Sequence, residues 1–344
     1  MEQRNSSPVV PSQLAVVMAA ALLADSFLQP FGRRAPLLAA RQGILCAAGQ
    51  MALFCFLFWL LRKNAAQAKK SRIFTGLLCG TLILSAALEI VQGERFYSQS
   101  MRAGLPVGIF LALLFVAVFY GVYSGLNALT RTAAAVLALT AVSVVLLMLS
   151  VLTQLRFVNL QPTALNGREL AQDFAGQIYL APELVIWSIL WKPDPSPKHK
   201  HRPAVVFGWL FGAQAFFCLL GEMTLGAAYQ QEEQPLFTIA RLGGISVFRR
   251  LDALHACVWM LLFLVKLTLY FWASTEALRH MIPALQGHSA FYVILAGVIG
   301  VFLAAWGRAE QAAYWIQQGA VLVLLLWLGV MRIAGKGGQR NEQV

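Results

Sequence analysis

Three ionisable residues lie inside long apolar stretches of the sequence. Asp25 follows the apolar run that begins at Gln13, Glu183 follows Pro182 in a second run, and Lys266 lies within a third. A charged side chain at the centre of a bilayer costs at least ~2.5–3.5 kcal/mol, so such residues need a partner or a function. The three residues predict either a polar site for a small ligand or cation, with Lys266 as counter-charge, or a buried ion pair that fixes helices.

The two acids have similar surroundings. Asp25 lies in Ala24-Asp25-Ser26-Phe27 with Pro30 close by, and Glu183 lies in Ala181-Pro182-Glu183. Interrupted membrane helices build the binding sites of many transporters, and their freed backbone groups contact the ligand. The predicted ligand-binding residues are therefore Ala24, Asp25, Ser26, Phe27, Ala181, Pro182, Glu183 and Lys266.

Three further acids are expected to be less important. Glu89 and Glu222 lie close to the predicted outer ends of their apolar segments, where headgroups and water would solvate a carboxylate. Asp252 begins another segment, where an acid favourably meets the positive end of the helix dipole. We therefore predict a structural role for each of these three residues.

The sequence contains no motif typical of an enzyme. It has no G-x-S-x-G, no H-E-x-x-H and no glycine loop that would cradle a phosphate. No two cysteines form a C-x-x-C pair, and all five lie in apolar segments, which predicts small buried residues. We expect no enzymatic activity, no bound metal and no cofactor. The cysteines are Cys46, Cys55, Cys79, Cys218 and Cys257.

Long apolar segments dominate the chain and would position these residues. Of its 344 residues, 59% are hydrophobic and only 12% are charged, about half the charged share of a soluble domain. A membrane-spanning helix needs about 20 mainly apolar residues, and ten segments approach that length. We place them near 12–31, 43–61, 73–91, 105–125, 133–155, 174–191, 204–228, 252–277, 288–306 and 312–333.

The basic residues predict how these helices are oriented. The net charge of +12 comes from Lys and Arg in the gaps between apolar runs, which is typical of cytoplasmic loops and argues against a nucleic-acid partner. With both termini in the cytoplasm, every lysine except Lys266 lies on the cytoplasmic side. The 229–250 loop is then external, and its 235–240 stretch is expected to form a short interfacial helix.

The expected fold is an all-α membrane protein of about ten transmembrane helices, arranged as two inverted five-helix repeats with helices one and six broken. The first repeat covers about 12–155 and the second about 174–333, within one permease-like domain of residues 12–333. Residues 1–11 and 334–344 are then cytoplasmic segments. This plan is common among secondary transporters.

Several segments together resemble the spore germination permease family, within the amino acid–polyamine–organocation transporter superfamily. One is Phe119 to Thr132, in which a tyrosine is followed by glycine, an apolar run and an arginine. A second is Leu160-Gln161-Pro162 with Gly167, leading to Pro182-Glu183 and Pro193. A third runs from Ile239 through Arg249-Arg250-Leu251-Asp252 to Lys266. Together, and in this order, the similar segments make the resemblance extend over nearly the whole chain.

The resemblance implies a function and partners. Members of this family are B subunits of nutrient germinant receptors, which sense a small nutrient of the amino-acid class and act with A- and C-type subunits in the inner spore membrane. The lipid bilayer and a small-molecule nutrient are thus the other expected partners. A secondary transporter of amino acids or related solutes, coupled to H⁺ or Na⁺, is the alternative, and a membrane scaffold without a ligand is a third.

Helix one departs from the family pattern. The family usually has glycines at its centre, where this chain has Leu23-Ala24-Asp25. The carboxylate of an amino acid normally contacts backbone N–H groups freed at such a break, and an aspartate there would repel it. The sequence therefore predicts that a plain amino acid does not bind in the standard way.

Overall fold

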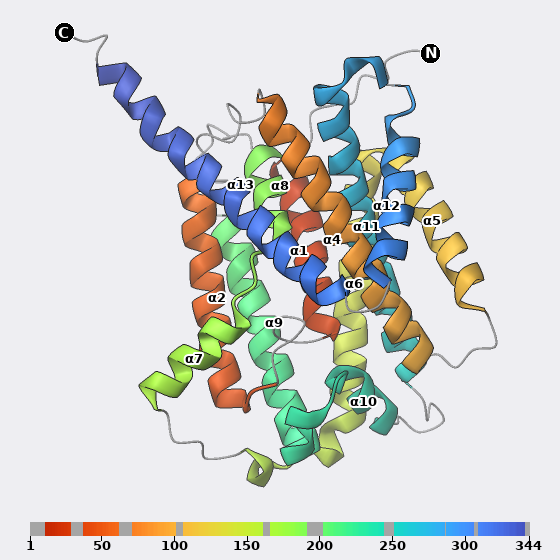
Figure 1. The fold of residues 1–344 in the computed structure, drawn as a ribbon. Helices are drawn as coiled ribbons and strands as arrows, with labels where there is room; N and C mark the ends of the chain where they lie inside the picture. The colour runs from red at the N-terminus through yellow and green to blue at the C-terminus, as the bar shows by residue number, and fades with distance from the viewer. Residues whose placement is uncertain are drawn as a thin grey trace.

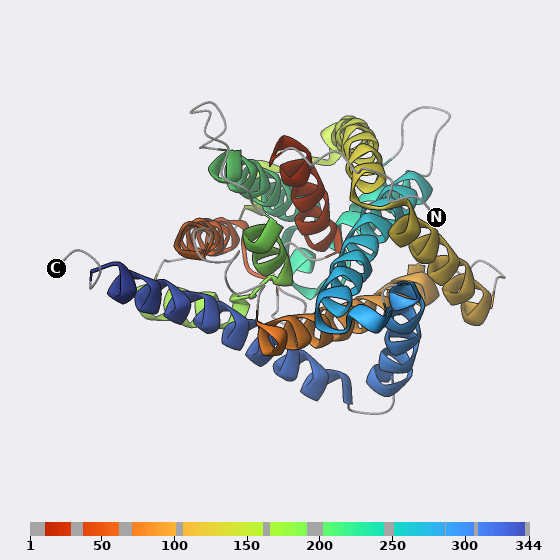
Figure 2. The same cartoon turned by 90° about the horizontal axis from the view of Figure 1, so that it is seen from above.

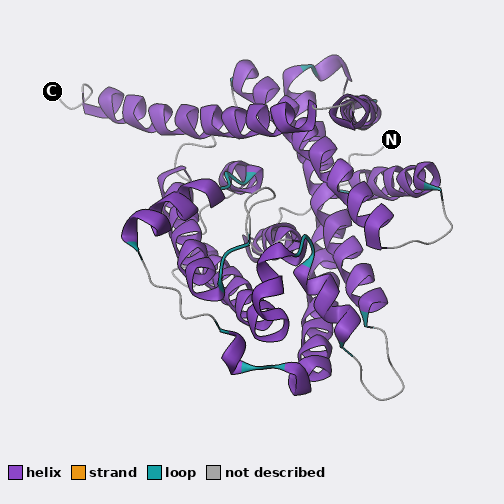
Figure 3. Cartoon of the chain, turned by 60° about the horizontal axis from the view of Figure 1, so that its bottom comes forward, coloured by secondary structure: helices purple, strands orange, loops and turns teal. Residues whose placement is uncertain are grey.

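A computed structural model describes residues 11–28, 37–61, 71–100, 106–160, 166–190, 202–243, 251–285, 287–305 and 309–340. Within these ranges the chain forms helices joined by short loops, and no strand is found there (Figures 1 and 3). The all-α prediction is confirmed. The basic residues of the 62–70 and 191–201 loops lie outside the described ranges.

Seven helices of the described chain are long and apolar enough to cross a membrane. Two shorter apolar helices and the α7–α8 segment correspond to the other three of the ten segments predicted from the sequence. The long helices are α2 (Ala40–Leu61), α4 (Arg72–Ser100), α5 (Val107–Ser124), α6 (Leu126–Val151), α9 (Arg202–Leu225), α11 (Asp252–Met281) and α13 (Ala309–Arg340). The shorter ones are α1 (Pro11–Leu28) and α12 (Ser289–Ala305).

The sixth predicted segment, residues 174–191, is interrupted, as the sequence predicts. Helix α7 (Gly167–Gln177) ends before Ile178, and α8 (Pro182–Leu190) begins at the proline. Proline is favourable at the start of a helix, because its missing N–H would have no helical partner there. The result is a four-residue non-helical stretch, residues 178–181, directly before Glu183.

The first crossing is regular over its described length. Helix α1 is continuous from Pro11 to Leu28 and includes Ala24 to Phe27, so these residues are helical and not unwound. Residues 29–36, where the sequence places Pro30, lie outside the described ranges. The predicted break in helix one is therefore not found within Pro11–Leu28.

Helix α11 lies at the centre of the bundle. It packs against α1, α4, α5, α6 and α12, and in Figure 2 its cyan ribbon runs through the middle of the assembly. Most of its side chains are buried, including the large aromatic residues Trp259, Phe263, Tyr270 and Phe271. A residue near the middle of α11 therefore has no direct route to lipid.

Short helices close one end of the bundle. The predicted helix in the 229–250 loop is present as α10 (Pro235–Leu242), which packs against α1, α6, α9 and α11. Leu236, Ile239 and Ala240 are buried in these contacts. The 3₁₀ turns of the chain are η1 (Leu152–Gln154), η2 (Phe157–Asn159), η4 (Gly226–Gln231) and η5 (Pro283–Leu285).

The cysteine prediction holds for three of the five residues. Cys46, Cys79 and Cys218 are buried, Cys55 is partly buried, and Cys257 is exposed. Cys257 lies in the first turns of α11, on a face that no other described helix covers.

Candidate functional site

A buried cluster of charged residues joins four helices near the middle of the bundle. Lys266 of α11 is fully buried, and its Nζ lies 2.5 Å from Asp25 Oδ1 of α1 and 2.6 Å from Glu89 Oε1 of α4. Glu183 Oε1 of α8 lies 3.3 Å from the same nitrogen. These four residues are called the charge cluster below. Lys266 is about 21 Å from the start of α11 at the helical rise of 1.5 Å per residue, close to its midpoint.

The sequence predicted three members of this cluster. Asp25, Glu183 and Lys266 were expected to approach one another, and the structure brings all three together. The two readings that the sequence left open, a ligand site and a structural ion pair, are compatible with this geometry. Both begin from the same fact, that the ammonium group has no solvent around it.

The prediction for Glu89 is wrong. The side chain is buried and paired with Lys266, and headgroups do not solvate it. The apolar run of this segment ends near residue 91, but α4 continues through polar residues to Ser100. Glu89 therefore lies well inside a 29-residue helix and not at its end.

Glu222 is also buried, contrary to the prediction. Its Oε2 accepts a hydrogen bond of 2.5 Å from the backbone N–H of Ala40, the first residue of α2. The first N–H groups of a helix have no partner within the helix, and a carboxylate at this end also interacts favourably with the helix dipole. Glu222 thus joins α9 to α2 in a structural role. Asp252 lies in the first turn of α11, where the sequence placed it, and is buried.

Tyr270 was not identified from the sequence. It lies one helical turn after Lys266 on α11 and donates a 2.7 Å hydrogen bond from its hydroxyl to Glu183 Oε1. The Lys266 ammonium also lies 5.6 Å from the centroid of the Tyr270 ring. The spacing of four residues is the only sequence signal, because it places both side chains on one face of the helix. Glu183 Oε1 is thus held by two groups of α11.

The other carboxylate oxygen of Glu183 is in a different position. Glu183 Oε2 is buried and accepts no hydrogen bond from the described residues. A buried acceptor without a donor is unfavourable by about 1–3 kcal/mol, more for a charged group. The carboxylate therefore presents an open acceptor next to the interrupted helix.

The non-helical stretch before Glu183 is held by two glutamine side chains. Gln50 of α2 donates from Nε2 to the Tyr179 carbonyl and accepts from the Tyr179 N–H, at 2.8 and 3.3 Å. Gln318 of α13 accepts from the Leu180 N–H at 2.9 Å. Backbone groups of a broken helix must be satisfied within the protein, because lipid offers no partner. Sequence reasoning missed both glutamines, since they lie in other segments.

The remaining predicted site residues lie around this stretch and around Asp25. Ala181 and Pro182 are buried at the start of α8. Ala24 is buried, and the buried Ser26 hydroxyl accepts a 3.2 Å hydrogen bond from Gln214 of α9. Phe27 belongs to α1, but its side chain lies outside the described part of the chain.

The charges of the cluster do not balance. One ammonium group faces three carboxylates, which leaves an excess of two negative charges when all are ionised. Carboxylates that lie close together disfavour one another's ionised form. The site therefore favours positive charge, whether as protons or as a bound cation.

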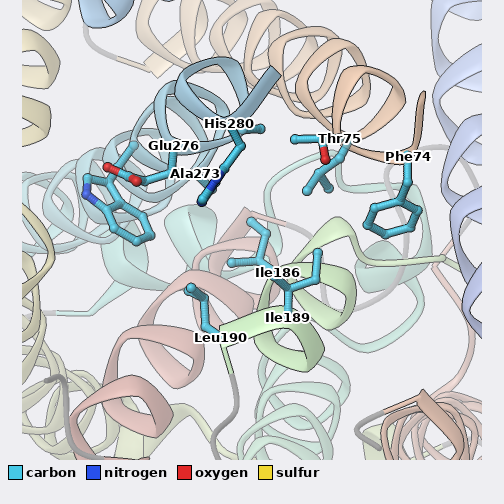
Figure 4. Close-up of a pocket in the computed structure, with 11 residues that line it drawn as sticks. Phe74, Thr75, Ile186, Ile189, Leu190, Ala273, Glu276 and His280 are labelled. Carbon is cyan, nitrogen blue, oxygen red and sulfur yellow. The ribbon is translucent and has the colours of Figure 1, made fainter. Parts of the chain in front are cut away.

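A pocket begins one helical turn from the cluster. It lies between α4, α8 and α11, and Figure 4 shows the side chains of all three helices around it. Ile186 follows Glu183 by three residues, and Ala273 follows Tyr270 by three. The space between the walls is about 430 Å³, counting the space at the mouth. The lining is mainly apolar: Phe74, Leu78, Ile186, Ile189, Leu190, Trp272, Ala273 and Ala277, with Thr75, Glu276 and His280 as its polar members.

Comparison with known proteins identifies the family. Residues 71–309 match the family described as spore germination protein, which is more than half of the chain. The chain belongs to this family. The matched region includes three members of the charge cluster and the interrupted helix, and Asp25 lies before it. No curated protein matches the sequence.

A solved transporter structure has the same fold. Mhp1, a nucleobase-cation-symport-1 family transporter in a closed conformation with bromovinylhydantoin bound, matches with a TM-score of 0.63. The match covers 96% of this chain and 78% of that one at 14% sequence identity. The spore germination family member described here is thus a multi-pass membrane protein with a transporter fold.

Proposed function

We propose that this chain is the B subunit of a nutrient germinant receptor and senses a small nutrient in a pocket of a transporter fold. Membership of the spore germination family supports this proposal. By the same resemblance the protein acts in the inner spore membrane with A- and C-type subunits, and its nutrient is of the amino-acid class. Residues 24–27, 181–183 and Lys266 contribute to the ligand site.

The observation that carries the proposal is the meeting of Asp25, Glu89, Glu183 and Lys266 beside an interrupted helix. Four helices each bring one charged residue to this point, and three of the four residues are almost fully buried. A sensor needs a ligand contact that changes the relative positions of helices. An ion-paired cluster shared by α1, α4, α8 and α11 is such a contact, because a ligand that replaces one of its pairs alters all four.

A second function is favoured by the excess of carboxylates. A secondary transporter coupled to H⁺ or Na⁺ needs a group that takes up and releases the ion, and Asp25 or Glu183 would serve. Sensor and transporter use the same site and differ in whether solute crosses the membrane.

The test uses spores that carry the unmodified chain or the Glu183→Gln variant with their partner subunits present. We expect the variant to lose germination through this receptor while germination through other receptors in the same spores is unchanged. Immunoblotting checks that the variant accumulates. Normal germination by spores with normal amounts of the variant would contradict a role for the cluster in sensing.

Uptake distinguishes the two functions. Purified protein in proteoliposomes is expected to bind its nutrient without accumulating labelled solute under a proton or sodium gradient. Gradient-driven uptake that Glu183→Gln abolishes would favour the transporter and contradict the pure sensor.

A further inference from the structure

We infer that the ligand of this site is a protonated monoamine with a short apolar tail, whose ammonium group binds at Glu183. This inference rests on the proposed small-ligand site, but it replaces the amino-acid class that the family resemblance implies with an amine. It differs from a plain amino acid in one respect: the ligand carries no free carboxylate.

The first argument concerns the donors of Lys266. An ammonium group has three N–H donors, and three carboxylates lie within 3.3 Å of the Lys266 nitrogen. A carboxylate on the ligand would have to displace one of them. It would also enter a site whose formal charge is already negative, which is unfavourable.

The second argument concerns the acceptors. Glu183 Oε2 is buried and receives no hydrogen bond from the described residues, although Oε1 receives one from Tyr270. A ligand ammonium group would supply a hydrogen-bond donor to Glu183 Oε2. Charge-assisted hydrogen bonds of this kind are stronger than neutral ones.

The third argument concerns the shape of the neighbouring pocket. Ile186 lies one turn from Glu183, which is about 4.5 Å along α8, and begins the pocket lined by Leu78, Ile189 and Trp272. In the proposed binding mode the ammonium group lies at Glu183, outside the lining that Figure 4 shows, and the substituent passes Ile186 into this pocket. The tail would leave the cluster toward the end of the bundle where α4 begins and α8 ends.

The test measures binding to the purified full-length protein in detergent at neutral pH, by calorimetry and thermal shift. The probes are the n-alkylamines from ethylamine to hexylamine, the carboxylates from propanoate to hexanoate, and the zwitterions alanine and norleucine. We expect the amines to bind and the carboxylates and zwitterions not to bind. Affinity should rise ~4-fold for each methylene that enters the pocket.

Two variants locate the binding site. Glu183→Gln should weaken amine binding by on the order of 10- to 100-fold, whereas Glu169→Gln on the exposed face of α7 should leave it unchanged. Ala273→Leu, which fills part of the pocket, should remove the gain in affinity with chain length. This second variant keeps the proposal testable if Glu183→Gln does not fold.

The outcomes separate this inference from the proposed function. Binding of alanine or norleucine that depends on Glu183 would overturn the amine inference and leave the sensor proposal standing. Amine binding that Ala273→Leu and Glu183→Gln do not change would overturn the placement of the ligand. If no probe binds, the amine inference is wrong, and the spore experiment decides the sensor proposal alone.

Discussion

Lys266 connects three carboxylates from three other helices, so its charge determines how those helices meet. We expect Lys266→Met to insert into the membrane but to unfold more readily, because it leaves buried acids without their counter-charge. Breaking a buried ion pair in this way costs about 3–5 kcal/mol. Thermal melting in detergent measures the effect, with Leu264→Met on the same helix as the control. A Lys266→Met protein with the same melting temperature as the unmodified protein would contradict a structural role for the cluster.

Asp25 has a different role from Lys266. Its carboxylate accepts a hydrogen bond from the Lys266 ammonium group that a ligand carboxylate would otherwise use. Two carboxylates ~4 Å apart repel by ~4 kcal/mol at an effective dielectric of 20, roughly a thousandfold in affinity. We therefore expect Asp25→Gly to create or strengthen binding of alanine. Thermal shift with a panel of amino acids tests this, and Ala24→Gly controls for a glycine in α1. Tight alanine binding by the unmodified protein, without improvement in Asp25→Gly, would show that Asp25 does not repel the ligand.

The residues of the site were partly predictable. Asp25, Glu183 and Lys266 stand out because a charge inside an apolar run is costly wherever the helix lies. Glu89 carries the same cost, but the polar residues after Val91 placed it at the end of the membrane segment, although α4 continues to Ser100. Helices do not end where hydropathy ends, and this single misplaced boundary concealed the fourth member of the cluster.

At the scale of elements, the interruption between α7 and α8 depends on side chains from other helices. Gln50 satisfies both backbone groups of Tyr179, so we expect Gln50→Leu to destabilise the protein by about 1–3 kcal/mol per stranded buried group. Hydrogen exchange should rise at residues 178–183 in particular. Gln172→Leu, on the exposed face of α7, is the control and should change neither quantity. Unchanged exchange in Gln50→Leu would mean that the break is held in another way.

The close packing of α4 against α11 leads to a second prediction about how the helices fit together. A Cβ atom added to Gly93 would lie 2.7 Å from Phe263 Cζ, whereas one added to Gly80 in the same helix meets nothing within 4 Å. Phe263 is buried and stacked on Trp259, so it has little freedom to move. We expect Gly93→Ala to destabilise by about 1–3 kcal/mol, as other overpacked cores do. Gly80→Ala should be neutral or stabilising by up to about 1 kcal/mol, and thermal melting compares the two. Equal melting temperatures would show that Phe263 moves aside.

The elements were more predictable than the contacts between them. Apolar runs predicted the membrane helices, since a bilayer imposes a minimum length on each. Seven described helices reach that length. Pro182 predicted the break in the sixth crossing, because proline starts a helix more readily than it continues one. The same reasoning, applied to Pro30, predicted a break around Ala24 to Phe27, but these residues form a regular helix. Pro30 lies further along the chain and does not interrupt it there. Gln50 and Gln318 were beyond prediction, since long-range partners leave no local pattern.

For the whole molecule, the fold followed from composition and order more than from any single residue. A transporter structure with 14% identity matches 96% of this chain, so the arrangement of helices survives almost complete replacement of the side chains. A match at this identity concerns the fold alone, so the role of the charge cluster has to be argued from this chain's own residues. A shared fold does not identify a ligand, and this is why the ligand has to be argued from Glu183, Lys266 and the pocket beside them.

The orientation of the whole molecule in the membrane gives the last prediction. The ten crossings predicted from the sequence would place both termini on the same side. The excess of lysine in the 62–70 and 191–201 loops favours the cytoplasm for that side. We expect Gln67→Cys to react with an impermeant thiol reagent only after sealed right-side-out vesicles are opened. Glu233→Cys, in the loop before α10, should react from outside, and the unsubstituted protein controls for the exposed Cys257. Labelling of position 67 in intact vesicles would show that the topology is the reverse of the predicted one.

The pocket between α4, α8 and α11 lies toward the end of the bundle where α4 begins, so in the predicted orientation it opens to the cytoplasm. An inverted topology would open it to the outside, where a nutrient first meets the protein.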